Sequence, residues 1–269
     1  MEIPQKNDDN ALEMYTLQCR NHILKPLAEK YGIDTSDEAI RAAVDQHNEV
    51  CRLIRQIGDF RKEANPRVTG YEFHILTMAS YVAPKHLILD KLRETLEEIK
   101  TREPDAADKY RARVVFVGSE VDDVDVIKLV EESGAYVCAD RFCYGSLPGR
   151  DEIILNDEED VVKQICRQVQ GRAQCPRYWD MAKMTGRRDY VADLAKEYGA
   201  DGIIYEQMKF CDPWAYERMI GTIVLRDEHG YPVLAVDRPY SIGSSGQMRT
   251  RVQAFVESIE IKKIQGGKK

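Results

Sequence analysis

Cysteine residues placed near predicted strand ends are the clearest candidates for chemistry in this chain. The sequence contains seven: Cys19, Cys51, Cys138, Cys143, Cys166, Cys175 and Cys211. No pair has the CxxC spacing of a zinc ribbon or of a thioredoxin-type motif. Their number is odd and the first ten residues lack an apolar core, so neither a disulfide framework nor a secretory signal is expected. A metal site made of these thiols has to be assembled in space, from separate loops or from a second chain.

Cys211 is the strongest candidate ligand. It follows a predicted strand at residues 202–205 and precedes a helix that Asp212 and Pro213 open. The positive end of the helix dipole and the nearby Lys209 are expected to lower the pKa of this thiol and to favour an iron-binding thiolate. The alternative is a half-buried loop residue that only packs, because free cysteine behaves as a small apolar side chain.

Two further cysteines are weaker candidates of the same kind. Cys143 lies in the loop 141–150 that follows a predicted strand, and Cys175 lies in a long loop that can reach the same edge of a sheet. The remaining four, on a strand or on helical faces, are expected to pack in the core. The set of co-ligands to Cys211 therefore stays open at this point.

Residues of two other loops are candidate substrate-binding groups. Ser119 follows the first predicted strand, and Gly246, Gln247 and Arg249 stand at the start of the last predicted helix. Backbone N–H groups at a helix start bind phosphate or carboxylate. The Gly-Ser-Ser-Gly turn before this helix matches neither a Walker A motif nor a GxGxxG fingerprint. A flexible turn followed by a solvated basic helix face is the alternative.

Helices are expected in the first part of the chain, residues 1–110. Apolar residues at three- and four-residue spacing predict helices at 8–30, 35–62, 70–82 and 84–101. Asp8, Asp9 or Asn10 is expected to cap the first helix, and Gly32 to end it. Thr35 and Glu38 have the spacing of a capping box for the second helix.

Strands alternate with helices in the second part, residues 111–269. Short apolar runs predict strands at 113–119, 135–140, 202–205 and 232–236, and helices at 122–133, 157–170, 186–198, 213–225 and 247–263. This alternation predicts an α/β fold: a helical segment, then a doubly wound, mainly four-stranded parallel sheet flanked by helices. Ligands of such sheets bind beyond the carboxyl ends of the strands, where the candidate residues lie.

Composition excludes several classes of protein. The 269 residues have a formal net charge of −7, and 43% of them are hydrophobic. This content supports a folded core, and no apolar run is long enough for a membrane span. With this net charge the chain is not expected to have nucleic acid as its main ligand, since phosphate binding needs a basic face. We expect a cytoplasmic protein.

Several segments, taken in order, resemble one enzyme family. They are VVFVGSEVDDVDVIKLVEESGAYVCADRFCYGS (114–146), QCPRYWD (174–180), GADGIIYEQMKFCDPWAYE (199–217), PVLAVDRPY (232–240) and GQMRTRVQAFVESIE (246–260). Together they resemble the 2-hydroxyacyl-CoA dehydratase and benzoyl-CoA reductase superfamily, in particular the D-component of 2-hydroxyglutaryl-CoA dehydratase. The resemblance extends over nearly the whole chain and does not separate dehydratase from reductase.

The resemblance implies a cofactor and partners. It implies an iron–sulfur protein of an anaerobe that works with a related second subunit and holds a [4Fe–4S] cluster through three cysteines, of which Cys211 matches the C-terminal one. It also implies an ATP-hydrolysing iron–sulfur activator, which supplies one low-potential electron for reaction of an acyl-CoA thioester. Residues 111–269 would then be the cluster-ligand domain, and residues 1–110 the remainder of a first half.

The sequence departs from the family pattern at its start. Family members usually have an additional N-terminal α/β half with further ligands, and this chain begins where that half should end. We therefore expect the C-terminal portion of a family subunit, with Cys143 and Cys175 as replacement ligands or with thiolates from another chain. Two alternatives are a cluster-free α/β binding or assembly module and, from fold analogy alone, a flavodoxin-like nucleotide or flavin binder.

Overall fold

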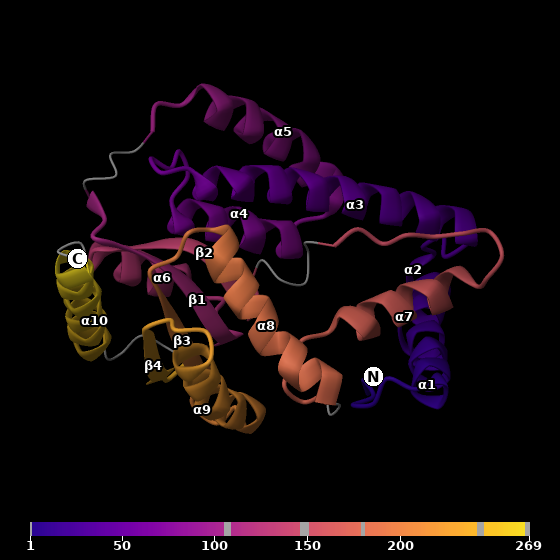
Figure 1. Ribbon diagram of the computed structural model, residues 1–269. Helices are drawn as coiled ribbons and strands as arrows, with labels where there is room; N and C mark the ends of the chain where they lie inside the picture. The colour runs from indigo at the N-terminus through magenta and orange to yellow at the C-terminus, as the bar shows by residue number, and fades with distance from the viewer. Residues whose placement is uncertain (1, 105–108, 146–150, 179–180, 241–244, 267–269) are drawn as a thin grey trace.

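Four parallel strands form the centre of the computed structural model, which describes residues 2–104, 109–145, 151–178, 181–240 and 245–266. The strands β1 (Ala112–Glu120), β2 (Ala135–Tyr144), β3 (Gly202–Met208) and β4 (Val233–Arg238) lie in the order β2-β1-β3-β4. Every neighbouring pair is parallel. The predicted α/β fold with a four-stranded parallel sheet is confirmed (Figure 1).

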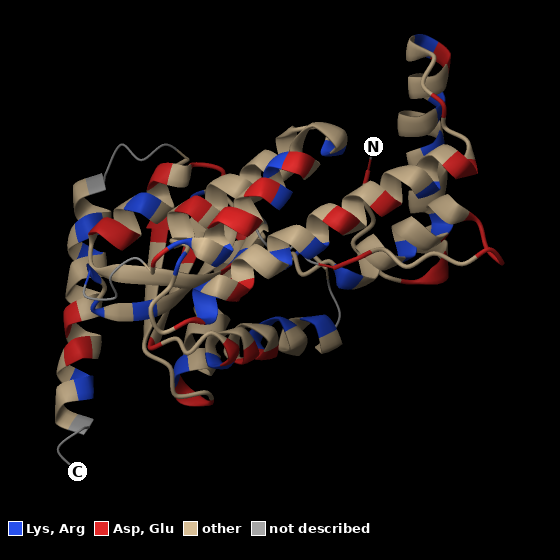
Figure 2. Ribbon diagram, turned by 90° about the horizontal axis from the view of Figure 1, so that it is seen from above, with Lys and Arg blue, Asp and Glu red and all other residues tan. Residues whose placement is uncertain are grey.

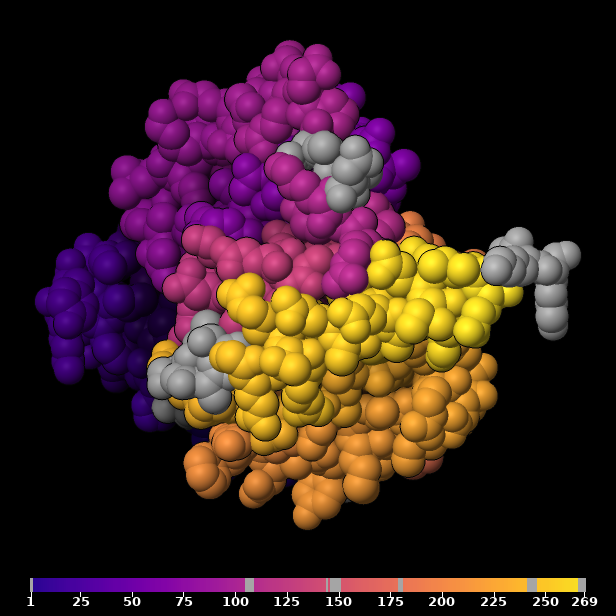
Figure 3. Space-filling view, turned by 90° about the vertical axis from the view of Figure 1, so that its left-hand side faces the viewer, coloured from indigo at the N-terminus to yellow at the C-terminus, as the bar shows by residue number. Residues whose placement is uncertain are grey.

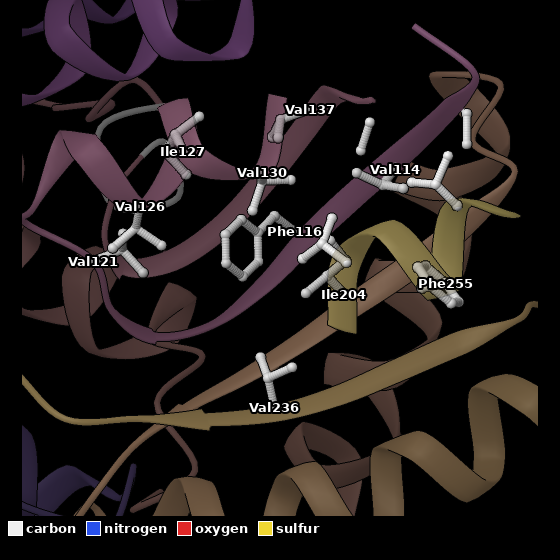
Figure 4. Packing of buried hydrophobic residues seen from close by; sticks show 14 of the residues in the cluster. Val114, Phe116, Val121, Val126, Ile127, Val130, Val137, Ile204, Val236 and Phe255 are labelled. Carbon is white, nitrogen blue, oxygen red and sulfur yellow. The ribbon is translucent and has the colours of Figure 1, made fainter. Parts of the chain in front are cut away.

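Helices cover both faces of this sheet, because alternate residues of a buried strand point to opposite sides. Val114 and Phe116 of β1 face a cluster that includes residues of α6 (Val124–Glu132) and α10 (Ser245–Gly266), as Figure 4 shows. Val115 and Val117 face a second cluster with residues of α8 (Met181–Glu197) and α9 (Asp212–Asp227). In Figure 3, α10 lies in yellow across the side of the molecule that it covers.

A helical segment precedes the sheet, as the sequence predicts. It consists of α1 (Asp9–Cys19), a π-helical turn (Arg20–Leu24), α2 (Lys25–Tyr31), α3 (Asp37–Asp59), a 3-10 turn (Phe60–Lys62), α4 (Gly70–Val82) and α5 (Lys85–Thr101). Helices α3, α4 and α5 share a core that contains Ile54, Phe73 and Leu92. Helix α1 packs instead on α7 (Val161–Arg172), beside which it lies in Figure 1. The division of the chain into two domains at residue 110 stays a prediction.

Two of the predicted ends of the first helices were right and one predicted capping box was wrong. Asp8 caps α1, since its side chain accepts the N–H of Ala11 at 2.8 Å. Gly32 ends α2 in the left-handed region at φ 63°, as expected for glycine. The capping box at Thr35 was wrong, because α3 begins two residues later. Ser36 is its N-cap and accepts the N–H of Ala39, whose side chain cannot complete a box.

A buried carboxylate joins the helical segment to the helices of the sheet. Thr69 and Glu72 form the capping box of α4, which was not predicted from the sequence. The N–H groups of Gly70 and Tyr71 in the same helix turn donate to the carboxylate of Glu131 on α6, at 2.8 and 3.1 Å. The first N–H groups of a helix have no partner within the helix. At α4 they are therefore satisfied by another element.

Acidic and basic residues are interspersed along the helices, as the colours of the ribbon in Figure 2 show. Among the residues that the model describes, no helix is long and apolar enough to cross a membrane.

Candidate functional site

The carboxyl ends of the strands meet at one edge of the sheet, where the candidate cysteines converge. Cys143 is the last residue but one of β2, and Cys211 follows β3 by three residues. Since all strands run in parallel, these two positions share the edge. Cys175 follows α7 in the loop before α8.

Cys211 occupies the N-cap position of α9, with Pro213 in the first helical turn. The backbone N–H of Trp214 donates to its sulfur, which favours the thiolate, but partial burial is the larger effect and raises the pKa of Cys211. Lys209 lies 3.9 Å from Asp237, with which it forms an ion pair. The expectation that the helix start lowers the pKa of Cys211 in this chain was therefore wrong, because desolvation outweighs the helix N-terminus.

Cys143 and Cys175 are in hydrogen-bond contact with each other. This bond is the main reason that the pKa of Cys175 falls to about 6, while the same bond and burial raise the pKa of Cys143. The sulfur of Cys143 also accepts the indole N–H of Trp214 at 3.0 Å. The two thiols are thus polarised in opposite directions: Cys175 carries the negative charge and Cys143 keeps its proton.

Arg141 holds the loop of Cys175 in place. This buried strand residue donates through Nε to the side-chain oxygen of Gln174 at 3.0 Å, and through a terminal nitrogen to the Gln174 carbonyl at 2.7 Å. Its guanidinium lies 5.0 Å from the Trp214 ring centre. Negative charge on Cys175 raises the pKa of Cys211, so the two thiols lie within electrostatic range of each other. The structure therefore brings all three candidate cysteines into one neighbourhood.

The contact between Cys143 and Cys175 does not suit two ligands of one iron–sulfur cluster. Such ligands bind different iron atoms and are held apart by the cluster, whereas hydrogen-bonded thiols touch. Among the described residues, no group of three or more His, Cys, Asp or Glu side chains is arranged to hold a metal ion. Cys211, partly exposed at a helix start, is compatible with one ligand bond. The rest of the ligand set is not assembled in this conformation.

A cavity of about 690 Å³ adjoins the thiol pair. It is lined by Cys143 and Arg141 of β2, by Cys175 and Arg177 of the loop after α7, and by Phe73 of the helical segment. This volume is in the range of sites that bury a small organic molecule. The cavity thus combines apolar walls, cationic groups and two sulfur atoms.

Ser119 is buried in a polar network below this edge. Its hydroxyl donates to the Glu206 carboxylate at 2.9 Å and accepts the backbone N–H of Met208 at 2.7 Å. Glu206 in turn lies 2.9 Å from Nε of Arg238. Ser119 is 1% exposed, so its groups hold strand ends together rather than face solvent.

The predicted anion-binding turn lies partly outside the described residues, which resume at position 245. Gly246 and Gln247 are exposed in the first turn of α10. Arg249 forms an ion pair with Glu132 of α6 at 3.0 Å. Arg249 thus pairs with a residue of the neighbouring helix. Substrate binding by Gly246, Gln247 and Arg249 stays a prediction.

The other cysteines pack as expected for core residues. Cys51, Cys138 and Cys166 are buried. Cys19 of α1 and Cys166 of α7 form a second thiol pair, with their sulfur atoms 3.6 Å apart.

Three residues of the site, Arg141, Trp214 and Glu206, were not predicted from the sequence. A signal existed for two of them, because a charged residue within a buried apolar strand needs a partner. Asp140 and Arg141 interrupt β2 in this way, and Glu206 interrupts β3. Asp140 pairs with buried Arg61 at 3.1 Å.

Comparison with known proteins defines the family. The model of the family "2-hydroxyglutaryl-CoA dehydratase, D-component" matches residues 1–259, and the chain belongs to this family. It is 25% identical to the (R)-phenyllactyl-CoA dehydratase beta subunit of Clostridium sporogenes, over 96% of this chain and 67% of that protein. It is also 25% identical to the beta subunit of (R)-2-hydroxyglutaryl-CoA dehydratase from Acidaminococcus fermentans, over 95% and 67%. A benzoyl-CoA reductase subunit of Thauera aromatica is 23% identical, over 97% and 67%.

Proposed function

We propose that this chain is an iron–sulfur subunit of a 2-hydroxyacyl-CoA dehydratase or of a benzoyl-CoA reductase-type enzyme. Cys211 would supply one thiolate to a [4Fe–4S] cluster, and a second polypeptide would supply the others. The observation that carries the proposal is the position of Cys211 at the start of α9, beside the sheet edge that also bears the cavity and the thiol pair. Membership of the family supports the same assignment.

The cluster, when bound, would pass one low-potential electron from an ATP-hydrolysing activator to an acyl-CoA thioester. The chain's own residues position the Cys211 sulfur and favour its thiolate. Trp214 donates its backbone N–H to the Cys211 sulfur, which favours the thiolate that iron requires. Partial burial limits access of water to that sulfur.

The cavity and the names of the relatives support one substrate class, coenzyme A thioesters. Their names share coenzyme A thioesters of small acids, both aliphatic and aromatic. A cavity of about 690 Å³ with Phe73 on one wall suits the acyl part of such a thioester. Arg141 and Arg177, which also line the cavity, suit the polarised thioester carbonyl or an acidic group.

A related second subunit and a cytoplasmic location complete the proposal. Each of the relatives is named as one subunit of a larger enzyme, two of them as the beta subunit of a dehydratase and one as a subunit of a reductase. Because the ligand set is not assembled within the described residues, we expect iron to be retained only when a partner adds thiolates.

The test of the proposal measures iron and acid-labile sulfide in protein purified without oxygen, alone and with a related subunit. Equal amounts of iron and sulfide with the partner present, lost in Cys211→Ser, are the expected result. Cys138→Ala is the matched control, because Cys138 is buried in the sheet and should not affect iron. Full iron retention by Cys211→Ser would exclude Cys211 as a ligand.

One observation favours a second candidate function, a cluster-free α/β binding or assembly module. Within the described ranges no three potential ligands surround a common point, and two of the candidate thiols bind each other. Absence of iron both with and without the partner, together with binding of coenzyme A thioesters, would support this module.

A further inference from the structure

The thiols of Cys143 and Cys175 meet in the wall of a cavity, although 31 positions of sequence and helix α7 separate them. Both residues line the cavity and neither is fully buried, so a small molecule that enters the cavity meets this pair. The two side chains are hydrogen-bond partners.

The surroundings give the two thiols different chemical roles. The backbone N–H of Arg177 donates to the sulfur of Cys175, and the guanidinium groups of Arg177 and Arg141 favour its negative charge. The thiol of Cys143 donates a hydrogen bond to Cys175 and accepts one from the indole N–H of Trp214. A thiolate stabilised by cations beside a protonated thiol is the arrangement of an attacking and a resolving cysteine.

We propose that Cys143 and Cys175 form a reversible dithiol–disulfide site that exchanges with low-molecular-weight disulfides through the cavity. The Cys175 thiolate attacks one sulfur of the small disulfide, which forms a mixed disulfide and releases one small thiolate. Cys143 then loses its proton and attacks the Cys175 sulfur, which releases the second small thiol. Two electrons and two protons pass from the protein dithiol to the small disulfide, and the internal disulfide remains.

This site is independent of the proposed cluster ligand. It uses neither the sulfur of Cys211 nor a metal ion, so it goes beyond the proposed function. An internal disulfide would join the loop after α7 to the end of β2. It would also remove both thiols from the cavity wall.

The second thiol pair provides an internal comparison. Cys19 and Cys166 are also close, at 3.6 Å, but they lie in an apolar cluster with Leu12 and Val161. Burial raises the pKa of Cys166 to about 12, so it is a thiol at neutral pH. Proximity is thus common to both pairs. Cationic and N–H groups lower the pKa of Cys175, whereas burial outweighs the hydrogen bond of Thr16 at Cys166.

The test is a reaction of the full chain, reduced and kept without oxygen, with oxidised glutathione at pH 7. The mixture is blocked with N-ethylmaleimide, digested without reductant and analysed by mass spectrometry. The expected first product is a peptide pair linked through Cys143 and Cys175. A first linkage between Cys19 and Cys166, or no linkage at all, would overturn the proposal.

Variants separate the two roles. Cys143→Ser should stop at one glutathionyl group on Cys175, and Cys175→Ser should form neither product. Cys166→Ser and Cys211→Ser should form the linkage as the unmodified chain does. Loss of the linkage in Cys211→Ser would contradict independence of the two sites, whereas loss of iron in that variant concerns only the cluster.

A rate measurement keeps the proposal testable if a variant fails to fold. Iodoacetamide should alkylate Cys175 of the unmodified chain at least about tenfold faster than Cys166 at pH 7, because alkylation follows the thiolate fraction. Equal rates at the two positions would contradict an activated Cys175.

Discussion

The indole N–H of Trp214 donates a hydrogen bond to the sulfur of Cys143 over 3.0 Å. Trp214 lies in the first turn of α9, three residues after Cys211, and Cys143 lies near the end of β2. The Trp214 side chain is 1% exposed, so the bond is protected from water. This contact fixes the start of α9 relative to the thiol pair, and with it the relative placement of the three candidate cysteines.

Trp214→Phe should destabilise the chain by about 1–3 kcal/mol, because it removes this donor and leaves a small cavity. It should also slow alkylation of Cys143, since the indole hydrogen bond favours the Cys143 thiolate. Urea unfolding and maleimide kinetics measure the two effects. Tyr216→Phe is the control, because Tyr216 is exposed on the same helix, and its change should stay within about 0.5 kcal/mol. Equal effects of both changes would refute a role of the indole N–H.

Gly118→Ala should destabilise the sheet by about 1–3 kcal/mol through overpacking. A Cβ atom at position 118 would lie 2.7 Å from the carbonyl oxygen of Glu206 and closer still to its carboxylate. Gly186→Ala is the matched control, because nothing lies within 4 Å of a Cβ atom there and the residue is in the interior of α8. That change should stabilise the chain by about 0.5–1 kcal/mol. Thermal unfolding compares the two, and destabilisation by both would contradict the steric argument.

Glu131→Ala should cost at least about 2 kcal/mol in the free energy of unfolding, because it leaves buried N–H groups without an acceptor. Besides the start of α4, the N–H of Val137 donates to this carboxylate at 3.2 Å. The neighbouring Glu132→Ala removes only the half-exposed ion pair with Arg249 and should cost less than about 1 kcal/mol. Urea unfolding of both variants measures the difference. A cost for Glu131→Ala no greater than that of Glu132→Ala would show that the N–H groups find other partners.

Glu206 should make the free energy of unfolding fall as the pH rises from about 4.5 to 7, against the opposite contribution of His47 and His74, whose pKa values burial lowers. Burial raises the pKa of Glu206 to about 7, although Arg238 and Ser119 oppose the shift. In this range the folded chain keeps a proton that the unfolded chain has released, so stability declines with pH. Glu206→Gln, which cannot ionise, should remove this downward contribution from the profile measured by urea unfolding.

Glu131 contributes to the pH dependence of stability in the same range, because burial raises its pKa to about 7 as well. The difference between the profiles of the unmodified chain and Glu206→Gln therefore measures Glu206, rather than either profile alone. Profiles that run in parallel from about pH 5 to 7.5 would argue against a raised pKa of Glu206.

Much of the fold could be predicted because its signals are local. The spacing of apolar residues places helices and strands to within a few residues. Asp8 caps α1 through its side chain, and Gly32 ends α2 because glycine readily adopts a positive φ. Glu131 could not be predicted as the acceptor for α4, since the contact spans about 60 residues. The order of the strands is equally non-local, because it depends on which helices cover each face.

The sequence predicted where the candidate cysteines lie, but not which charged groups surround them. The rule that parallel strands end at one edge places Cys143 and Cys211 together. It does not show that Cys175 contacts Cys143, because Arg141 and Gln174 position that loop. The charge of Lys209 was assigned to Cys211 from proximity in sequence, whereas Asp237 of the neighbouring strand takes it.

The packing of α1 on α7 has a consequence for synthesis of the chain. These helices begin at Asp9 and Val161, so about 150 residues separate them. At about 5–20 residues per second, a ribosome needs roughly 8–30 s to make that stretch. During this time Leu12 and Tyr15 have none of their α7 neighbours. Helix α1 is therefore made well before its partner and docks late, and its apolar stripe stays open to a nascent-chain chaperone until α7 has been made.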